Sequence, residues 1–308
     1  MYGEGESSDL MQIENVEIRA LTGIDELAQV EDIQRTVWDD ASAVIYRNAL
    51  ISFSRNGAPV LGAFDDGRIV GFLLSYLGIE SPESQRPAMA NLKLVSQRMA
   101  VLPEYRDRGI GYALKLAQRD YALKQGIRLI TWTYDPLLSR NAHLNIRKLG
   151  AIVREYWRDY YGTTPSPQVV LGSSDRFVVE WWVTGNRVEQ RMSGKRGGLT
   201  LSQYTDANAR VLNPTLLAAN GSVYPGDMIY QPQGMVTLVE IPDDYYTLVQ
   251  DDPELARAWR EHSRDVLIST LASGYTVTDF VRGPYEGRLR SFYALSVVDA
   301  PIGGFSYN

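Results

Sequence analysis

The chain contains no cysteine and only two histidines, His143 and His262. Without cysteine, the protein can form no disulfide, use no thiol nucleophile and bind no metal through thiolates. Two histidines are also too few for a histidine-rich metal site. We therefore expect no metal centre.

The sequence also lacks any run of about 18 consecutive apolar residues, the length that a membrane-spanning helix needs. Its first residues, MYGEGESSDLMQIE, show no basic stretch followed by an apolar one, as a secretory signal would. The formal net charge is -6 at pH 7, whereas nucleic-acid-binding faces are usually basic. We therefore expect a cytoplasmic protein with no membrane or nucleic-acid partner, and the oligomeric state stays open.

With 308 residues, of which 44% are hydrophobic, the chain is longer than one typical domain and can bury a sizeable core. From Thr184 to Ser202 the composition becomes polar and rich in glycine, as in a linker or long loop. We therefore predict two domains, residues 1–190 and residues 191–308.

The first domain is predicted to be of the mixed α/β (α+β) class, with a central sheet flanked by helices. Apolar spacing predicts, in chain order, strand 16–21, helices 24–38 and 41–51, strands 59–64, 68–77 and 92–101, helix 112–124, strand 127–134, helix 139–149 and strands 151–161 and 176–183. Asp65-Asp66-Gly67 predicts a tight hairpin turn between two of these strands.

The second domain is predicted to be a smaller α/β domain, with strand 235–241, helix 253–272 and strand 275–281. This order repeats that of residues 92–134, which favours a degenerate internal duplication. The loop before its helix, however, contains five carboxylates and no glycine. It would repel a pyrophosphate, so the duplication would be structural only.

The segment Val101–Ala113, VLPEYRDRGIGYA, lies between a predicted strand and a predicted helix. Gly109 and Gly111 have no Cβ, so an anion could approach the backbone N–H groups at the helix start, and Arg106 and Arg108 add positive charge. The simpler alternative is a tight turn before a helix. A Walker loop would need Gly-Lys-Ser/Thr here, and a dinucleotide fingerprint would need a small residue in place of Leu114.

What remains is Arg-x-x-Gly-x-Gly after Pro103-Glu104-Tyr105, and this segment resembles the acetyl-CoA pyrophosphate loop of the GCN5-related N-acetyltransferases (GNAT). The predicted element order across residues 16–183 resembles that family too. The whole chain is similar to predicted bacterial acetyltransferases with a C-terminal extension. The resemblance implies a GNAT fold, acetyl-CoA as cofactor, and a small-molecule or protein amine as acceptor, with the second domain as a degenerate GNAT half.

The resemblance also implies a set of cofactor-binding residues. Backbone N–H groups from Arg108 to Ala113 would hold the pyrophosphate, the end of the preceding strand would pair with pantetheine, and a backbone N–H near Met99 would stabilise the oxyanion. The set is Met99, Ala100, Val101, Arg106, Arg108, Gly109, Ile110, Gly111, Tyr112, Ala113 and Asn141. Asn141 could equally be an ordinary residue of the helix start.

Direct acetyl transfer needs a base, because an alkylamine with a pKa of about 10.4 is protonated at neutral pH. Glu80, Glu83 and Asp135 follow strands on the expected cofactor side, although each could be an ordinary loop carboxylate and Asp135 a turn residue before Pro136.

The family's usual tyrosine acid is replaced here by Ile146, and Tyr134, Tyr156 or Tyr160 could take its place. From these we predict Glu80, Asp135 and Tyr134 as catalytic residues.

Two functions therefore stay open. The first is an acetyl-CoA-dependent N-acetyltransferase. The alternative is a catalytically silent acyl-CoA-binding module, whose C-terminal domain binds a partner or ligand; Ile146 and the absence of a clear base favour it.

Overall fold

A computed structural model describes residues 16–38, 44–80, 87, 90–166, 169–194, 198–219 and 221–297. Contacts within the chain divide it into two compact units. Unit 1 comprises residues 1–132 and 182–184, and unit 2 comprises residues 133–181 and 185–308. These units differ from the predicted domains 1–190 and 191–308, because residues 133–181 pack in the same unit as the C-terminal half. The domain boundary near residue 190 stays a prediction.

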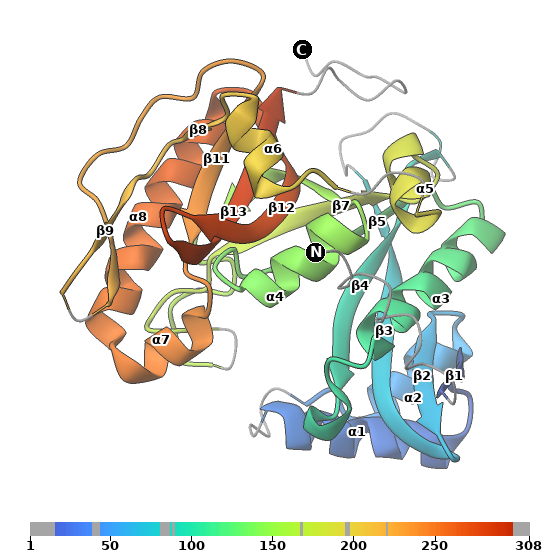
Figure 1. Cartoon of the computed structure of the whole chain (residues 1–308). Coiled ribbons are helices and arrows are strands. Elements are labelled where there is room, and N and C mark those ends of the chain that lie inside the picture. Colours follow the sequence, from blue (N-terminus) through green and yellow to red (C-terminus); the bar gives the residue numbers. More distant parts are fainter. Residues whose placement is uncertain are drawn as a thin grey trace. The chain divides into compact units, whose positions relative to one another are not determined.

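Unit 1 is a mixed sheet with helices, in the predicted α/β class (Figure 1). Its elements are β1 (Val16–Ala20), α1 (Ile24–Trp38), α2 (Arg47–Arg55), β2 (Val60–Asp65), β3 (Arg68–Ile79), β4 (Leu92–Val101), the 3₁₀ turn η3 (Pro103–Tyr105), α3 (Ile110–Lys124) and the first residues of β5 (Leu129–Tyr134). The strand order is β1-β2-β3-β4-β5, with β4 and β5 parallel and the other neighbours antiparallel.

The predicted hairpin turn between β2 and β3 is confirmed. Asp66 and Gly67 adopt φ values of 45° and 81°, the left-handed backbone that a two-residue type I′ turn requires. Asp65 consequently pairs with Arg68 across the hairpin.

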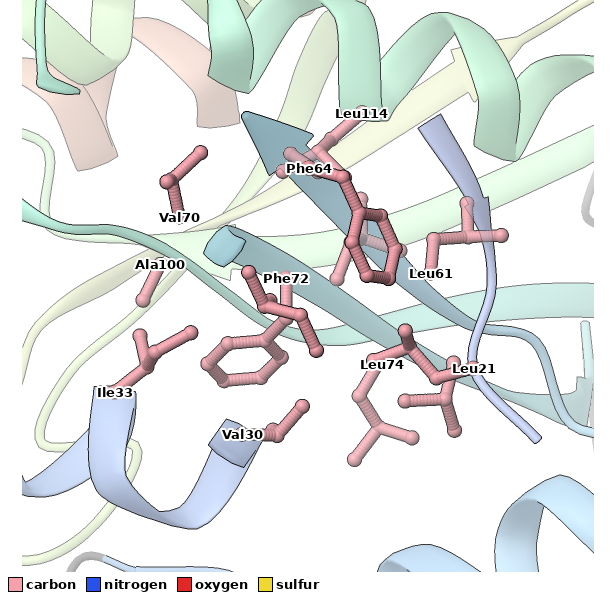
Figure 2. Close-up of a cluster of buried hydrophobic side chains, with 14 of the residues drawn as sticks. Leu21, Val30, Ile33, Leu61, Phe64, Val70, Phe72, Leu74, Ala100 and Leu114 are labelled. Carbon is pink, nitrogen blue, oxygen red and sulfur yellow. The ribbon is translucent and has the colours of Figure 1, made fainter. Parts of the chain in front are cut away.

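The core of unit 1 lies on both faces of β2 and β3, and most residues of both strands are buried. Figure 2 shows Val30 and Ile33 of α1 beside Phe72, with Phe64 beside Leu114 of α3. Because helices cover both faces, these strands are continuous apolar runs instead of alternating polar and apolar residues. Helix α3, which follows the glycine-containing turn, is therefore packed against β2 and β3.

Unit 2 contains the remaining elements. They are the short helix α4 (Ser139–Ala142), which continues as the π-helix η4 (His143–Lys148), then β6 (Ile152–Trp157), β7 (Arg176–Trp182) apart from its last residue, α5 (Asn186–Met192), α6 (Leu201–Asp206), β8 (Arg210–Val211), β9 (Thr215–Leu217), β10 (Val223–Pro225), β11 (Val236–Ile241), α7 (Tyr245–Asp251), α8 (Pro253–Ala272), β12 (Tyr275–Tyr285) and β13 (Arg288–Val297).

The main sheet of unit 2 has the order β7-β6-β12-β13-β11-β8, and β9 and β10 form a separate two-stranded sheet. Helix α8 begins as predicted, because the Asp252 carboxylate accepts a hydrogen bond from Leu255 N at 3.0 Å and Pro253 occupies the first turn. Its apolar face packs on β6, β11 and β12.

The predicted repeat of residues 92–134 in the second half is wrong in its strand order. In unit 1, β4 and β5 flank α3 in sequence and are direct neighbours. In unit 2, β11 and β12 flank α8, but β13 lies between them. A strand inserted between the two that flank a helix is a different topology from that of the glycine-containing segment.

Candidate functional site

The glycine-containing segment forms the N-terminus of α3. Helix α3 begins at Ile110, and Gly109 is its N-cap residue. The φ of Gly109 is 78°, a left-handed backbone conformation that residues with a Cβ rarely adopt. The helix therefore starts two residues earlier than predicted. Gly111, which we expected in the loop, lies in the first helical turn and its φ is not positive.

This geometry defines which backbone donors point out of the helix. The N–H groups of Ile110, Gly111 and Tyr112 belong to the first turn, where no carbonyl four residues earlier is within the helix. Ala113 N, in contrast, donates to Gly109 O at 3.0 Å. The predicted donor at Ala113 is therefore engaged within the protein, and the outward donors end at Tyr112.

The segment before Gly109 is attached to the β2–β3 hairpin. Tyr105 donates from its hydroxyl to Asp65 at 2.9 Å, and the guanidinium of Arg108 lies 5.0 Å from the centre of the Tyr105 ring. Arg106 Nε donates to Val101 O at 3.3 Å. Both arginines are exposed, so their charge is available at the mouth of the helix N-terminus.

Strand β4 is paired unevenly on its two edges. It pairs with β3 up to Val101, but with β5 only at Leu94↔Ile130 and Val95↔Thr131. Met99, Ala100 and Val101 therefore lie beyond the last β5 pair. An open strand edge of this kind can accept an extended chain that carries amide groups.

A buried lysine lies beside the point where β4 and β5 cease to pair, and the sequence analysis missed it. Lys115 is 2% exposed; its Nζ contacts Ser96 Oγ at 2.9 Å and Gln118 Oε1 at 3.1 Å, and lies 3.5 Å from the centre of the Trp132 ring. Burial lowers the pKa of Lys115 well below its ordinary value.

Glu80, one of the predicted bases, lies in unit 1 just after β3. It is half-buried, and its backbone N–H donates to Asn91 O at 2.7 Å. Glu83 lies outside the described residues.

The other two predicted catalytic residues lie in unit 2, and both are buried. The Tyr134 hydroxyl is 3.1 Å from the Tyr293 hydroxyl, which donates to Pro136 O at 2.7 Å. Burial raises the pKa of Tyr134 above its ordinary value. Asp135 forms a two-armed ion pair with Arg260, in which Nη1 lies 2.8 Å from Oδ1 and Nη2 lies 2.5 Å from Oδ2. Tyr134 and Asp135 are therefore buried and hydrogen-bonded in the way that structural side chains of a protein core are.

The helix that carries Asn141 and Ile146 also belongs to unit 2. Asn141 is half-buried in α4, and Ile146 is fully buried within the π-helix η4. Ile146 therefore serves the core where the family resemblance implied a tyrosine acid.

Within the part of the chain that the structure describes, no group of three or more metal-ligating side chains comes together. No helix among those residues is long and apolar enough to cross a membrane.

Comparison with known proteins matches residues 24–150 to the acetyltransferase (GNAT) family. No curated protein sequence matches the chain.

The chain is similar to three solved structures at low identity. The ribosomal-protein-S18-alanine N-acetyltransferase from Escherichia coli is 16% identical, with 55% of this chain and 94% of that chain covered and a TM-score of 0.41. A putative acetyltransferase from Salmonella typhimurium with its cofactor acetyl-CoA is 14% identical, with 56% of this chain and 96% of that chain covered and a TM-score of 0.44. An N-acetyltransferase from Staphylococcus aureus Mu50 is 17% identical, with 56% of this chain and 100% of that chain covered and a TM-score of 0.44.

Proposed function

We propose that this protein is an acetyl-CoA-dependent N-acetyltransferase acting on an amine, because residues 24–150 match the acetyltransferase (GNAT) family. One observation carries the proposal. The open edge of β4 leads, through a turn that Gly109 makes possible, into the outward N–H groups of α3. Donors for an anion and an edge for amide groups follow each other on one continuous segment.

The residues present fit the two ends of coenzyme A. Outward N–H groups of Ile110, Gly111 and Tyr112 and the partial positive charge of the helix N-terminus suit a pyrophosphate, and Arg106 and Arg108 supply full charges beside it. Gly111 has no Cβ to obstruct this approach. The cofactor, when bound, supplies an acetyl group activated as a thioester.

The edge of β4 suits the pantetheine arm. Its amide groups would pair with backbone groups of Met99, Ala100 and Val101, which lie beyond the last β5 pair. We propose that a backbone N–H of Met99 or Ala100 stabilises the oxyanion that forms at the thioester carbonyl. Acetyl transfer then forms the C–N bond to the amine and breaks the C–S bond, with the thiolate leaving.

Of the predicted bases, we favour Glu80. It must take one proton from the ammonium form of the acceptor, directly or through water, before attack. Asp135 is a poorer base because both its oxygens bind the Arg260 guanidinium. Tyr134 is a poor acid because its hydroxyl is buried and its pKa is raised, so we propose that solvent protonates the departing thiolate. Asn141 stays a proposed cofactor contact.

The alternative, a silent acyl-CoA-binding module, also has a specific observation in its favour. Two of the three predicted catalytic side chains, Tyr134 and Asp135, are bound within the core of unit 2, and Ile146 is buried and cannot donate a proton. Such a protein would keep the donors of α3 and the edge of β4 without turnover.

Release of free CoA thiol separates the two functions. The full chain is incubated with acetyl-CoA and a panel of primary amines that includes alkylamines, polyamines and peptides with free N-termini. The transferase predicts amine-dependent release from at least one acceptor, and Glu80→Gln should slow that release about a hundredfold while Glu17→Gln, on the exposed face of β1, leaves it unchanged. Binding of acetyl-CoA without release on any amine would establish the silent module instead.

A further inference from the structure

Three exposed aromatic side chains gather in unit 2 at the end of β6. Trp157, Tyr160 and Tyr161 are 52%, 45% and 50% exposed, whereas Trp181 and Tyr293 in the same unit are fully buried. We call these three residues the aromatic cluster. A contiguous group of exposed apolar side chains is a feature of ligand-binding and interaction sites.

The rings of the aromatic cluster stand at right angles to each other. Trp157 and Tyr160 have ring centres 5.9 Å apart with an interplanar angle of 76°, and Tyr160 and Tyr161 have centres 4.8 Å apart with an angle of 79°. Each ring edge therefore meets the next ring's face. Two perpendicular ring planes bound a corner, the arrangement in which aromatic residues surround a cationic group.

The backbone under the aromatic cluster is held by a series of hydrogen bonds. Asp159 N donates to Asp175 Oδ1 at 3.1 Å, Tyr160 N to Ser174 O at 3.1 Å, and Tyr161 N to Ser174 Oγ at 2.9 Å. Asp175 is itself fixed by the Arg264 guanidinium. The rings are thus preorganised, which reduces the entropic cost of binding.

Asp159 adds an uncommon backbone conformation at this point. Its φ is 45°, and its carboxylate accepts a hydrogen bond from Ser174 N at 3.3 Å. A non-glycine residue held in the left-handed region costs free energy that the surrounding contacts must offset. The strained residue is the one that turns the chain between Trp157 and the two tyrosines.

The charge distribution favours a cation over an anion. Aromatic faces are negative, and Trp157 Nε1 donates to Glu155 Oε2 at 3.0 Å, a hydrogen bond to a carboxylate that makes the indole face more electron-rich. The Arg176 guanidinium already lies 5.2 Å from the centre of the Tyr161 ring. Arg158 is a second, exposed cation here, and Asp159 lies 3.9 Å from the Arg264 guanidinium, so the Glu155 carboxylate beside Trp157 is the group that can attract a further cation.

We propose that the aromatic cluster binds an organic cation, an ammonium group that carries alkyl substituents. The alkyl groups contact the Trp157 and Tyr160 faces, and the Glu155 carboxylate provides the long-range attraction. A simple hydrated metal ion does not suit this site, because ring faces cannot replace its water ligands. The site does not depend on acetyl transfer, and its ligand need not be the acetyl acceptor.

The test compares choline with its neutral isostere 3,3-dimethylbutan-1-ol, by calorimetric titration of the full chain up to about 100 mM ligand. We expect saturable binding of choline and at least about tenfold weaker binding of the isostere, since only the cation gains from the ring faces. Trp157→Ala should weaken choline binding about tenfold, and Trp157→Phe, which keeps a ring face, should weaken it less than about threefold. Tyr246→Ala removes an exposed aromatic ring elsewhere in unit 2 and should change nothing.

Thermal unfolding of each variant shows whether it is folded, and Tyr161→Ala replaces Trp157→Ala if the latter is not. Equal affinity for choline and the isostere would reduce the aromatic cluster to an apolar patch. No saturable binding of choline would overturn the proposal outright. Concentration-dependent dimerisation that Trp157→Ala abolishes would assign the rings to self-association and overturn it as well.

Discussion

Lys115 and Asp135 are both buried ionisable residues, but their surroundings differ. Asp135 is paired with Arg260, and both side chains are almost fully buried. Lys115 has only the hydroxyl of Ser96, the amide of Gln118 and the face of Trp132 around its Nζ, and no carboxylate among the described residues forms an ion pair with it. We therefore expect different consequences of substitution at the two positions.

For Lys115→Met we predict an altered pH dependence of stability. In the unfolded chain the amine has a pKa of about 10.4, and in the folded chain burial lowers it. Between these two values the unfolded chain binds more protons, so the free energy of unfolding of the wild type rises with pH. Methionine does not titrate, so the stability of the variant relative to wild type should fall as the pH rises through alkaline values towards about 10.4, the pKa of the unfolded chain.

Urea unfolding of both proteins across this range measures the difference. Other groups contribute equally to both curves and cancel. Parallel curves for the variant and the wild type would show that the Lys115 pKa is not lowered.

For Asp135→Asn we predict a loss of about 3 to 5 kcal/mol in the free energy of unfolding, because the Arg260 charge would stay buried without its partner. Replacing both partners, as Asp135→Asn with Arg260→Met, should restore much of the loss. Urea unfolding of the two single variants and the double variant measures this coupling. If Asp135→Asn instead abolished acetyl transfer at unchanged stability, Asp135 would be a catalytic base after all.

At this scale the sequence predicted the local role of Asp135 but not its partner. Asp135 before Pro136 suggested a turn, and its carboxylate does accept a hydrogen bond from Leu137 N at 3.0 Å. Arg260 lies 125 residues further along the chain, and no local pattern links the two. The same reason explains why Lys115 of α3 was missed, since its burial depends on Ser96 of β4 and Trp132 of β5.

At the scale of elements, the two glycines of α3 have different functions. Gly109 has φ 78°, whereas Gly111 lies inside the helix. We predict that Gly109→Ala lowers the free energy of unfolding by about 1 to 2 kcal/mol through left-handed strain. Gly111→Ala should raise it by about 0.5 kcal/mol, because alanine favours helix.

Denaturant unfolding of the two variants and the wild type measures whether the free energy of unfolding falls in Gly109→Ala and rises in Gly111→Ala. Equal stability of Gly109→Ala and the wild type would mean that the turn does not require a left-handed residue at this position.

Element positions were predicted well where turn chemistry was explicit. The Asp66-Gly67 hairpin turn, the Asp252-Pro253 start of α8 and the strand before the glycines are all confirmed. The start of α3 was placed two residues late because Gly111 was treated as a loop residue. Chain order alone did not reveal that β13 lies between β11 and β12, since sheet neighbours depend on long-range pairing.

At the scale of the whole molecule, the compact units do not follow the polar stretch that predicted a boundary near residue 190. Residues 133–181 supply β6, which pairs with β12, and Asp135 and Asp175, which pair with Arg260 and Arg264 of α8. A composition change marks where a loop is tolerated. It does not show which segments share a core.

We therefore predict that a fragment of residues 1–190 is less stable than the full chain and that its residues 133–181 do not fold. It would expose the surface of β6 that α8 and β12 cover, and it would leave two buried carboxylates without their arginines. Urea unfolding followed by circular dichroism should show a lower urea midpoint for the fragment than for the full chain, with residues 133–181 unfolded in the fragment. A cooperative transition of the fragment at the urea midpoint of the full chain would mean that the predicted boundary marks an independent domain.

The central claim is that acetyl-CoA binds at the N-terminus of α3, and calorimetric titration of the full chain with acetyl-CoA tests it most directly. Gly111→Glu places a carboxylate among the outward N–H groups, where it suits the helix but repels a pyrophosphate, and Gly111→Ala is the matched control. We predict saturable binding by the wild type, a loss of no more than about threefold in Gly111→Ala and at least about a hundredfold loss in Gly111→Glu, with no loss of thermal stability in either variant. No binding by the folded wild type, or equal affinity of the wild type and Gly111→Glu, would contradict it.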